Sequence, residues 1–521
     1  MDEHGLRLRR FVNAIMNGAS TALQSESTQR TERSTALLAV QAVALVTVVR
    51  LVALLVADLD LGGDEAQYWW WAQSPDFGYY SKPPLIAWLI ALSTSVCGDG
   101  EACVRVTSPL LHAATSGILF IVARRLYDDR TGLWSCVTFL TLPGVTFSSG
   151  LITTDVPLLF FWSLGLLCFL EALNRRSAAA VGLGVAIGLG MLSKYAMIYF
   201  VISAILYCAV TPGARWFLRS REGAVALTLA LVVLAPNVWW NFANGFATLG
   251  HTVDNAAWSA SWFHPDRAVE FLAGQLAVFG PLLFPMLLAM AWSVWRSRKD
   301  GTPTGYGERE RLLLWFALPV LVLVTAQGLR SRAYANWAAV AYPSASIAVV
   351  AWLLNRGRTI WLKASLVLHL VVAAGMYGLA LRPEILDGLG LADPMAQVRG
   401  WSDLATGVST AMEEHPGGVL VTDSRMVTAE MLYYLRDQDV TIRIWDENGI
   451  PQDHFESTMP LGPEPRGPVL LLTGNPDPPR LRERFERVEG LGPVDKPAGP
   501  RRTRTFHLFL MTQPRGVWEP G

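Results

Sequence analysis

The chain is short of charge. Only 17% of its 521 residues are Asp, Glu, Lys or Arg, whereas an ordinary soluble domain carries about 25%. Lys plus Arg equals Asp plus Glu, at 43 each, so no basic surplus points to a nucleic-acid partner. Instead, 52% of the residues are hydrophobic and 20 are tryptophan, which favours membrane–water interfaces. The composition excludes an ordinary soluble protein and indicates an integral membrane protein.

Cysteine is scarce as well, and its five positions follow no metal-binding spacing. We expect the cysteines in apolar segments to be free and buried. Cys97 and Cys103 bracket a short loop, and they can form a disulfide if that loop faces an oxidising compartment. The sequence shows no internal repeat and no phosphate-binding loop. We expect no obligatory cofactor, with a divalent metal left open.

Apolar segments alternate with short basic turns. The first segment, 36–57, is long enough to cross a bilayer, and the polar residues 1–34 before it indicate a cytoplasmic N-terminus followed by a retained signal anchor. Basic residues mark cytoplasmic loops. Five candidate inside loops lie at 124–130, 174–177, 215–222, 295–301 and 355–358.

These basic loops determine the side of every turn. Both ends of 131–173 are inside, as are both ends of 178–211, so each stretch is a hairpin of two spans. Residues 85–103 are apolar but short and follow two prolines. We expect their helix to lie on the outer face, because a crossing would invert every later assignment. The result is about eleven spans at roughly 20 residues each. The remaining spans are 104–123, 223–240, 269–294, 312–326, 335–354 and 360–380.

The sequence thus predicts an α-helical polytopic membrane domain at 35–382, with its first outer loop at 59–103. The tail, 383–521, is richer in Pro, Gly and charged residues. Within it, "GGVLVTDS", "VTIRIW", "PVLLLTG" and "TFHLFLM" read as strands and "TAEMLYYL" as a helix. Strands alternating with helical patterns predict a small extracytoplasmic α/β domain.

Two adjacent acids lie just after the first span. Asp64 and Glu65 follow two glycines and precede three tryptophans. A carboxylate there can act as a general base toward an acceptor hydroxyl, or stabilise positive charge at a sugar carbon. The alternative is that both acids only cap an interfacial helix. We take Asp64 and Glu65 as catalytic candidates.

Three further ionisable residues lie at predicted outer turns. Lys82 precedes two prolines, which hold its backbone extended, and suits a phosphate; the alternative is a snorkelling lysine. Asp155 is a third catalytic candidate, although it also fits a helix N-cap. Lys194 interrupts an apolar hairpin and is a candidate for phosphate contact or for snorkelling. Such residues at membrane depth are costly and usually face a polar cavity.

The other candidates are expected to bind substrate. Arginine side chains in "GLRSRAYANW" match phosphate geometry, although headgroup anchoring fits them equally. A histidine in the long outer loop has no second ligand at metal-like spacing, so we expect no metal site there. The tyrosines and the asparagine can hydrogen-bond a sugar or belong to the interface belt. The residues are Tyr68, Asn241, His251, Arg330, Arg332 and Tyr334.

Several segments resemble the GT-C membrane glycosyltransferases, most of all the aminoarabinose (lipid A) transferase-like and protein-mannosyltransferase-like group. They include "DEAQYWWW", "GYYSKPPLIAWLI", "TTDVPLLFFW", "GLGMLSKYAM", "WWNFANGFAT" and "YANWAAVAYP". The resemblance covers about 35–355 in the same order and is weaker in the tail. The aminoarabinose transferases are expected to have more spans, so related galacturonosyl and mannosyl transferases remain alternatives.

The resemblance implies an inverting enzyme at the periplasmic face of the bacterial inner membrane. It implies a polyprenyl-phosphate-linked sugar as donor and a lipid such as lipid A, a polysaccharide or a protein as acceptor. The family's functional residues fall on Asp64, Glu65, Tyr68, Lys82, Asp155 and Lys194. The rival interpretation is a lipid or sugar transporter. Transporters tend to show repeated halves and binding at mid-membrane, whereas these polar residues gather at the outer ends.

Overall fold

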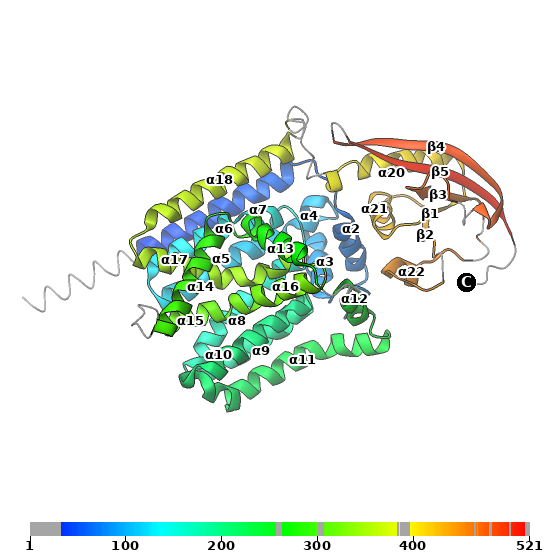
Figure 1. The fold of residues 1–521 in the computed structure, drawn as a ribbon. Helices are drawn as coiled ribbons and strands as arrows, with labels where there is room; N and C mark the ends of the chain where they lie inside the picture. Colours follow the sequence, from blue (N-terminus) through cyan, green and yellow to red (C-terminus); the bar gives the residue numbers. More distant parts are fainter. Residues whose placement is uncertain are drawn as a thin grey trace, which may run out of the picture.

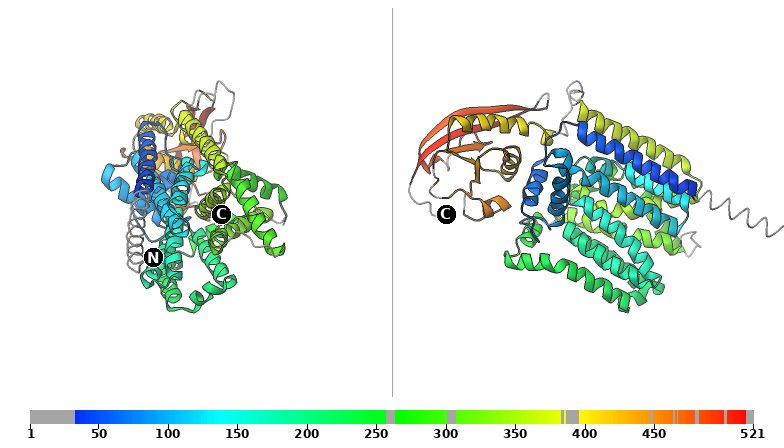
Figure 2. Two further views of the ribbon diagram at one scale, coloured as in Figure 1. Left: turned by 90° about the vertical axis from the view of Figure 1, so that its left-hand side faces the viewer. Right: turned by 180° about the vertical axis from the view of Figure 1, so that it is seen from behind.

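Apolar helices lie side by side in one bundle, and a sheet domain sits at one end of it (Figures 1 and 2). The computed structural model describes residues 33–256, 263–300, 307–382, 385, 396–446, 449–462, 465, 467–478, 482–499 and 502–515. Most of the predicted N-terminal segment 1–34 therefore lies outside the described residues.

Seven helices in the described ranges are long and apolar enough to cross a membrane. They are Arg33–Val56, Glu101–Leu126 (α4 and α5), Asp155–Leu173 (α8), Arg221–Ala243 (α11), Glu308–Arg330 (α15 and α16), Ala335–Asn355 (η3 and α17) and Thr359–Leu381 (α18). Within the composite helices the elements are α4 Glu101–Arg105, α5 Thr107–Leu126, α15 Glu308–Trp315, α16 Leu318–Arg330, η3 Ala335–Ala341 and α17 Tyr342–Asn355. Each corresponds to a predicted span.

One predicted span is broken. The helices α13 (Pro265–Val278) and α14 (Leu283–Asp300) meet at an angle of 113°, so the segment predicted as one span at 269–294 is bent in the middle, and its crossing as a single span stays a prediction. The break contains Gly280, whose φ is +101°, and the next residue is Pro281, which has no backbone N–H to continue a helix.

The other three predicted spans are shorter helices. The elements α9 (Ser177–Ser193), η1 (Tyr195–Met197) and α10 (Ile198–Val210) form the predicted hairpin around Lys194. The span after the first basic turn, 124–130, is divided into α6 (Asp129–Thr141) and α7 (Pro143–Ser148). The count of eleven spans stays a prediction, because length and composition alone support up to eight in the described residues.

Small residues let helix α9 pack closely on helix α11. A Cβ added at Gly184 would lie 2.5 Å from the Ala226 carbonyl oxygen, and one at Gly188 would lie 2.5 Å from Val233 Cβ. Close backbone approach through small residues is how helices associate in a bilayer, where no hydrophobic force separates them from lipid. The sequence "AVGLGVAIGLG" therefore places α9 directly against α11.

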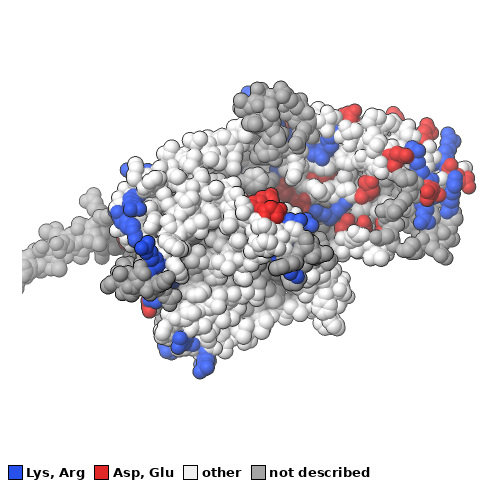
Figure 3. Space-filling view, in the orientation of Figure 1, with Lys and Arg blue, Asp and Glu red and all other residues white. Residues whose placement is uncertain are grey.

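The basic turns gather at one end of the bundle, as predicted. Arg125 and Arg176 both pair with Glu171, and the guanidinium of Arg175 lies 3.9 Å from the ring centre of Trp216. Three separate turns are thus in mutual contact. Figure 3 shows Lys and Arg at the end away from the sheet domain, with a nearly uncharged surface between.

The tail forms a five-stranded sheet in the order β2-β1-β3-β5-β4. Strand β1 pairs in parallel with β2 and β3, and β5 runs antiparallel to β3 and β4. The four predicted strands and the predicted helix are present. The strands are β1 Val419–Thr422, β2 Thr441–Ile444, β3 Val469–Thr473, β4 Phe485–Gly499 and β5 Arg502–Pro514. The sequence analysis missed β4, whose glycines and prolines interrupt any alternation.

The sheet domain and the first outer loop share one core. The loop carries α2 (Gly63–Ala72) and α3 (Leu85–Cys97), and the domain adds α20 (Trp401–Glu414), α21 (Arg425–Tyr434) and α22 (His454–Thr458). Trp69 and Ile90 belong to the same buried cluster as Val427 and Leu432. The boundary at 383 stays a prediction, because the core is continuous across it. The remaining short elements are η2 Pro212–Arg219, α12 Ala247–Ala256 and η4 Ala396–Val398.

Candidate active site

The glycine before the acidic pair allows the sheet domain to dock. A Cβ added at Gly63 would lie 3.0 Å from both Cβ and Cγ of Met426, and such contacts are tighter than packed side chains accept. Helix α21 therefore approaches α2 directly at its first turn. The approach is reinforced by Trp69, whose ring lies edge-on to Tyr433 at 4.9 Å between ring centres.

Asp64 meets a cation from the sheet domain. Arg425 Nη1 lies 2.9 Å from Asp64 Oδ1, and the Asp64 side chain is 61% exposed. The same nitrogen donates to Gln67 Oε1, 358 positions away in the chain. The sequence analysis missed Arg425. Its only local signal is a positive charge at the first position of a helix, where the helix dipole disfavours it.

Glu65 is held in a different way. Its side chain is buried, and it accepts hydrogen bonds from Arg105 Nε at 2.9 Å and Nη2 at 2.7 Å. Two backbone N–H groups, of Ile152 at 2.8 Å and Gly62 at 3.0 Å, also donate to it. The bond to Gly62 is the expected helix cap. A buried carboxylate with four donors and a paired charge is held in one position, and the catalytic role of Glu65 stays a prediction.

Asp155 and Lys194 form an ion pair. Lys194 Nζ lies 2.7 Å from Asp155 Oδ1, and Asn336 Nδ2 donates to Oδ2 at 2.8 Å. Asp155 is the first residue of α8, and the N-cap is Thr154, which makes no side-chain capping bond. The carboxylate is thus used in the site rather than as a cap. The predicted placement of both turns on one side is confirmed, and Asn336 was missed.

Lys82 and Tyr68 belong to the same charged region. The Lys82 backbone carbonyl accepts from Tyr79 N at 3.2 Å. Burial lowers the pKa of Lys82, and burial followed by the charge of Asp64 raises the pKa of the buried Tyr68 hydroxyl well above its ordinary value. The charges that act on Lys82 are those of Asp64, Lys194, Arg425 and Asp155.

Asn241 lies inside a helix rather than at the start of a loop. Helix α11 continues to Ala243, so the predicted outer loop begins later than expected. The Asn241 side chain is buried and donates to the Tyr195 hydroxyl at 3.2 Å and the Asn237 carbonyl at 3.0 Å. Asn237 in turn donates to the Phe77 carbonyl at 2.7 Å. Asn241 thus supports the turn beside Lys194.

The remaining candidates line neighbouring segments. The His251 ring lies 5.8 Å from that of Tyr80. Arg330 ends α16, and Arg332 Nη1 donates to the Tyr334 hydroxyl at 3.2 Å. Their segment continues to Asn336 and so reaches Asp155. Substrate binding by these four residues stays a prediction.

A disulfide and the possibility of a metal site were both left open by the sequence. Cys97 and Cys103 are joined by a disulfide, with 5.9 Å between their Cα atoms. Among the described residues, no group of three or more His, Cys, Asp or Glu side chains could hold a metal ion.

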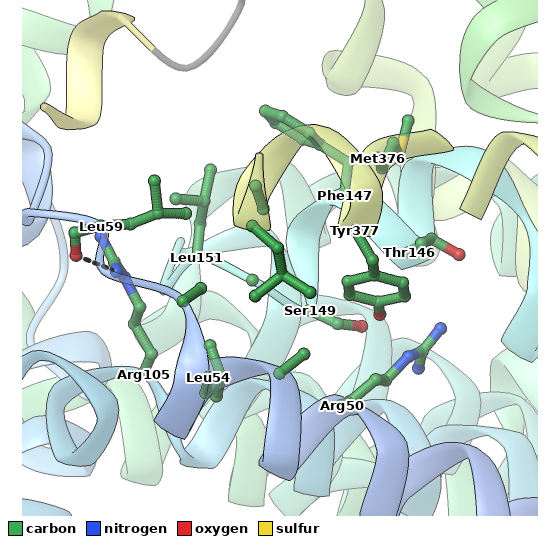
Figure 4. Close-up of a pocket in the computed structure, with 15 residues that line it drawn as sticks. Arg50, Leu54, Leu59, Arg105, Thr146, Phe147, Ser149, Leu151, Met376 and Tyr377 are labelled. Carbon is green, nitrogen blue, oxygen red and sulfur yellow. Dashed lines mark hydrogen bonds between the residues drawn. The ribbon is translucent and has the colours of Figure 1, made fainter. Parts of the chain in front are cut away.

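A mostly apolar pocket lies behind the site, between the first helix, α7 and α18 (Figure 4). Arg105 lies at one end of it and Arg50 at the other. Arg50 Nη2 donates to the Leu140 carbonyl at 2.5 Å, which is left free where α6 ends before Pro143. Arg50 therefore caps a broken helix, and the pocket reaches the site through Leu59, Arg105 and the segment 149–151.

Known proteins match this chain over most of its length. A family model described as dolichyl-phosphate-mannose-protein mannosyltransferase matches residues 81–240. Lipid A galacturonosyltransferase RgtD of Rhizobium johnstonii is 34% identical over 438 residues, 82% of this chain and 90% of that protein. Undecaprenyl phosphate-alpha-4-amino-4-deoxy-L-arabinose arabinosyl transferase 1 of Pseudomonas fluorescens is 26% identical over 282 residues, 50% of this chain and 48% of that protein. Among solved structures, apo ArnT from Cupriavidus metallidurans has a TM-score of 0.64 at 16% identity, covering 90% of this chain and 97% of that one.

The helical bundle with the sheet domain docked at its end has the fold of ArnT. The 34% identity to a galacturonosyltransferase over 82% of this chain makes it a multi-pass membrane glycosyltransferase. The chain belongs to the family of lipid A galacturonosyltransferase RgtD. The resemblance seen in the sequence is confirmed, and with it the expected fold class and enzyme class.

Proposed function

We propose that this glycosyltransferase moves a sugar from a polyprenyl-phosphate-linked donor to lipid A or another envelope acceptor, at the periplasmic face of the bacterial inner membrane. One observation carries the proposal: two acids and two lysines from four separate segments meet at one end of the bundle, as Asp64, Lys82, Asp155 and Lys194. The names of the relatives, which include lipid A and undecaprenyl phosphate, support the same substrates.

The proposed reaction is a direct displacement with inversion. The oxygen of the acceptor hydroxyl forms a bond to the anomeric carbon, and the bond from that carbon to the phosphate oxygen breaks. The phosphate leaves with the bonding electron pair, and the hydroxyl proton passes to the exposed carboxylate of Asp64. Exposure suits this role, because a general base must be within hydrogen-bond reach of the proton that it takes.

The lysines balance the charge of the leaving phosphate. Lys82 is held beside the acids, and its ammonium stabilises the charge that develops on the phosphate oxygen. The Lys194 ammonium has three N–H groups and donates one of them to Asp155. The other two N–H groups can bind the phosphate of the sugar donor. Arg330 or Arg332 supplies a further cation. Asp155 and Asn336 hold Lys194 in place, and Glu65 with Arg105 holds the first turn of α2.

The periplasmic side is supported by the other end of the bundle. Arginine-rich turns gather there, as cytoplasmic loops do. The Cys97–Cys103 disulfide lies on the side of the site, and disulfides persist in oxidising compartments such as the bacterial periplasm.

The test uses the purified full-length protein with lipid-linked sugar and lipid A, with products identified by mass spectrometry. Asp64→Asn is expected to lower turnover about 100-fold or more, and the anomeric configuration of the product, read by NMR, should be inverted. The matched control is Asp58→Asn, an exposed acid six positions earlier, which should leave turnover unchanged. Lipid translocation in vesicles without sugar transfer would instead identify a transporter.

A further inference from the structure

The sheet domain places the guanidinium of Arg425 in the site. Arg425 begins α21, and Met426 beside it packs on Gly63. At the other end of the same helix, the Tyr434 hydroxyl accepts a hydrogen bond from Leu61 N at 2.8 Å. Both ends of α21 are therefore tied to the segment that carries Asp64, so the guanidinium of Arg425 has a fixed position relative to that acid.

The guanidinium has one edge in use and one edge open. Both of its contacts, to Asp64 and to Gln67, are made by Nη1. In the described residues no hydrogen bond is made by Nε or Nη2, and the side chain is 34% exposed. An arginine fork binds a carboxylate through two parallel hydrogen bonds. The open edge of Arg425 is therefore a carboxylate site beside the proposed base.

The position of Arg425 points to the sugar rather than to the phosphate. In the proposed reaction the anomeric carbon lies between the acceptor hydroxyl at Asp64 and the phosphate at Lys82. A cation fixed on Asp64 is next to the transferred sugar ring. Besides burial, the positive charge of Arg425 contributes to lowering the pKa of Lys82, and it opposes the rise in the pKa of Tyr68. Arg425 therefore belongs to the same site as these two residues.

We propose that Arg425 binds the carboxylate of a uronic-acid donor sugar and makes the enzyme selective for it, which rests on the proposed function. The relative that matches 82% of the chain is named a galacturonosyltransferase, and a galacturonosyl group carries a carboxylate at C6. The relative named for an amino sugar matches half of the chain. An amino sugar is cationic and would be repelled by Arg425.

The test compares two polyprenyl-phosphate donors, galacturonic acid and galactose, which differ only in having a carboxylate or a hydroxymethyl group at C6. Wild-type protein is expected to prefer the uronic acid in kcat/KM by about 100-fold or more. Arg425→Gln should lower kcat/KM with the uronic acid at least about tenfold more than with galactose, so that most of the preference is lost, and any slowing through Asp64 should be shared by both donors. Arg425→Lys, which keeps the charge and loses the fork, should retain part of the preference.

The matched control is Arg436→Gln. Arg436 lies just past the same helix, with its guanidinium 4.3 Å from the Tyr433 ring centre, and its loss should leave the donor preference unchanged. Equal loss of both donors in Arg425→Gln would overturn the proposal and assign Arg425 to the positioning of Asp64. An unchanged donor preference with a raised KM for lipid A would overturn it in favour of acceptor binding. Absence of transfer from either donor by the wild type would overturn the proposed function itself.

Discussion

The buried pair of Glu65 and Arg105 should control the stability of the site rather than its chemistry. The perturbation is Glu65→Leu, which removes the acceptor of two hydrogen bonds from Arg105 and of one each from Ile152 N and Gly62 N. Arg105 is 3% exposed, so its charge stays buried after the change. Removing one partner of a buried pair costs about 3–5 kcal/mol. We expect a loss of that size in the free energy of unfolding.

The assay is a double-mutant cycle. Unfolding free energies are measured by denaturant titration in detergent for Glu65→Leu, Arg105→Met and the double variant. Because the double variant leaves no buried charge, it should be more stable than the sum of the single losses predicts, by about 2–3 kcal/mol. Carbonyl groups of Leu59 and Asp60 lose Arg105 as donor in the double variant, so the recovery should be incomplete.

One result would refute this account. Glu65→Gln keeps the shape of the side chain and loses its charge, so it should destabilise the protein and lower turnover only as far as the site is displaced. A Glu65→Gln protein with wild-type unfolding energy and no transfer would show that Glu65 takes part in the chemistry directly.

Two further predictions concern charge and sidedness. Burial lowers the pKa of Lys82, so its ammonium is present at low pH and is lost as the pH rises through that lowered pKa. The value of kcat/KM should therefore decline with rising pH before the ordinary lysine range is reached. The Lys82→Arg variant, whose guanidinium stays charged, should lack that decline. If Lys82→Arg shows the wild-type profile, another group titrates. A membrane-impermeant thiol reagent added from the periplasmic side should label the Ser74→Cys variant, whose cysteine lies in the exposed loop after α2. The same reagent should not label Arg130→Cys, which lies in a basic turn. The reverse labelling pattern would contradict the proposed orientation.

Much of the membrane part follows from local rules. Basic turns and span length alone placed Asp155 and Lys194 on one side, and the structure joins them at 2.7 Å. The rule works because it depends on hydropathy and charge within a few residues. It cannot show the 113° bend between α13 and α14, because both halves remain apolar and a hydropathy window averages across Gly280 and Pro281.

The site itself depends on contacts between distant segments, which a single sequence does not reveal. Asp64 and Glu65 look equivalent in the sequence, and only their partners, Arg425 and Arg105, separate an exposed acid from a buried one. Arg425 lies in a tail whose resemblance to the family is weak. Asn336 was overlooked for a similar reason: beside two arginines and a tyrosine, an amide carries no local signal.

The close packing of Met426 on Gly63 has a consequence for biogenesis. The first outer loop emerges early in synthesis, yet it shares its buried cluster with residues of the sheet domain, such as Val427 and Leu432, that are translated more than 300 residues later. The core that covers Trp69 and Trp71 is therefore complete only when the sheet domain is present. The contacts that fix the first turn of α2 beside Arg425 can therefore form only after the sheet domain has been synthesised.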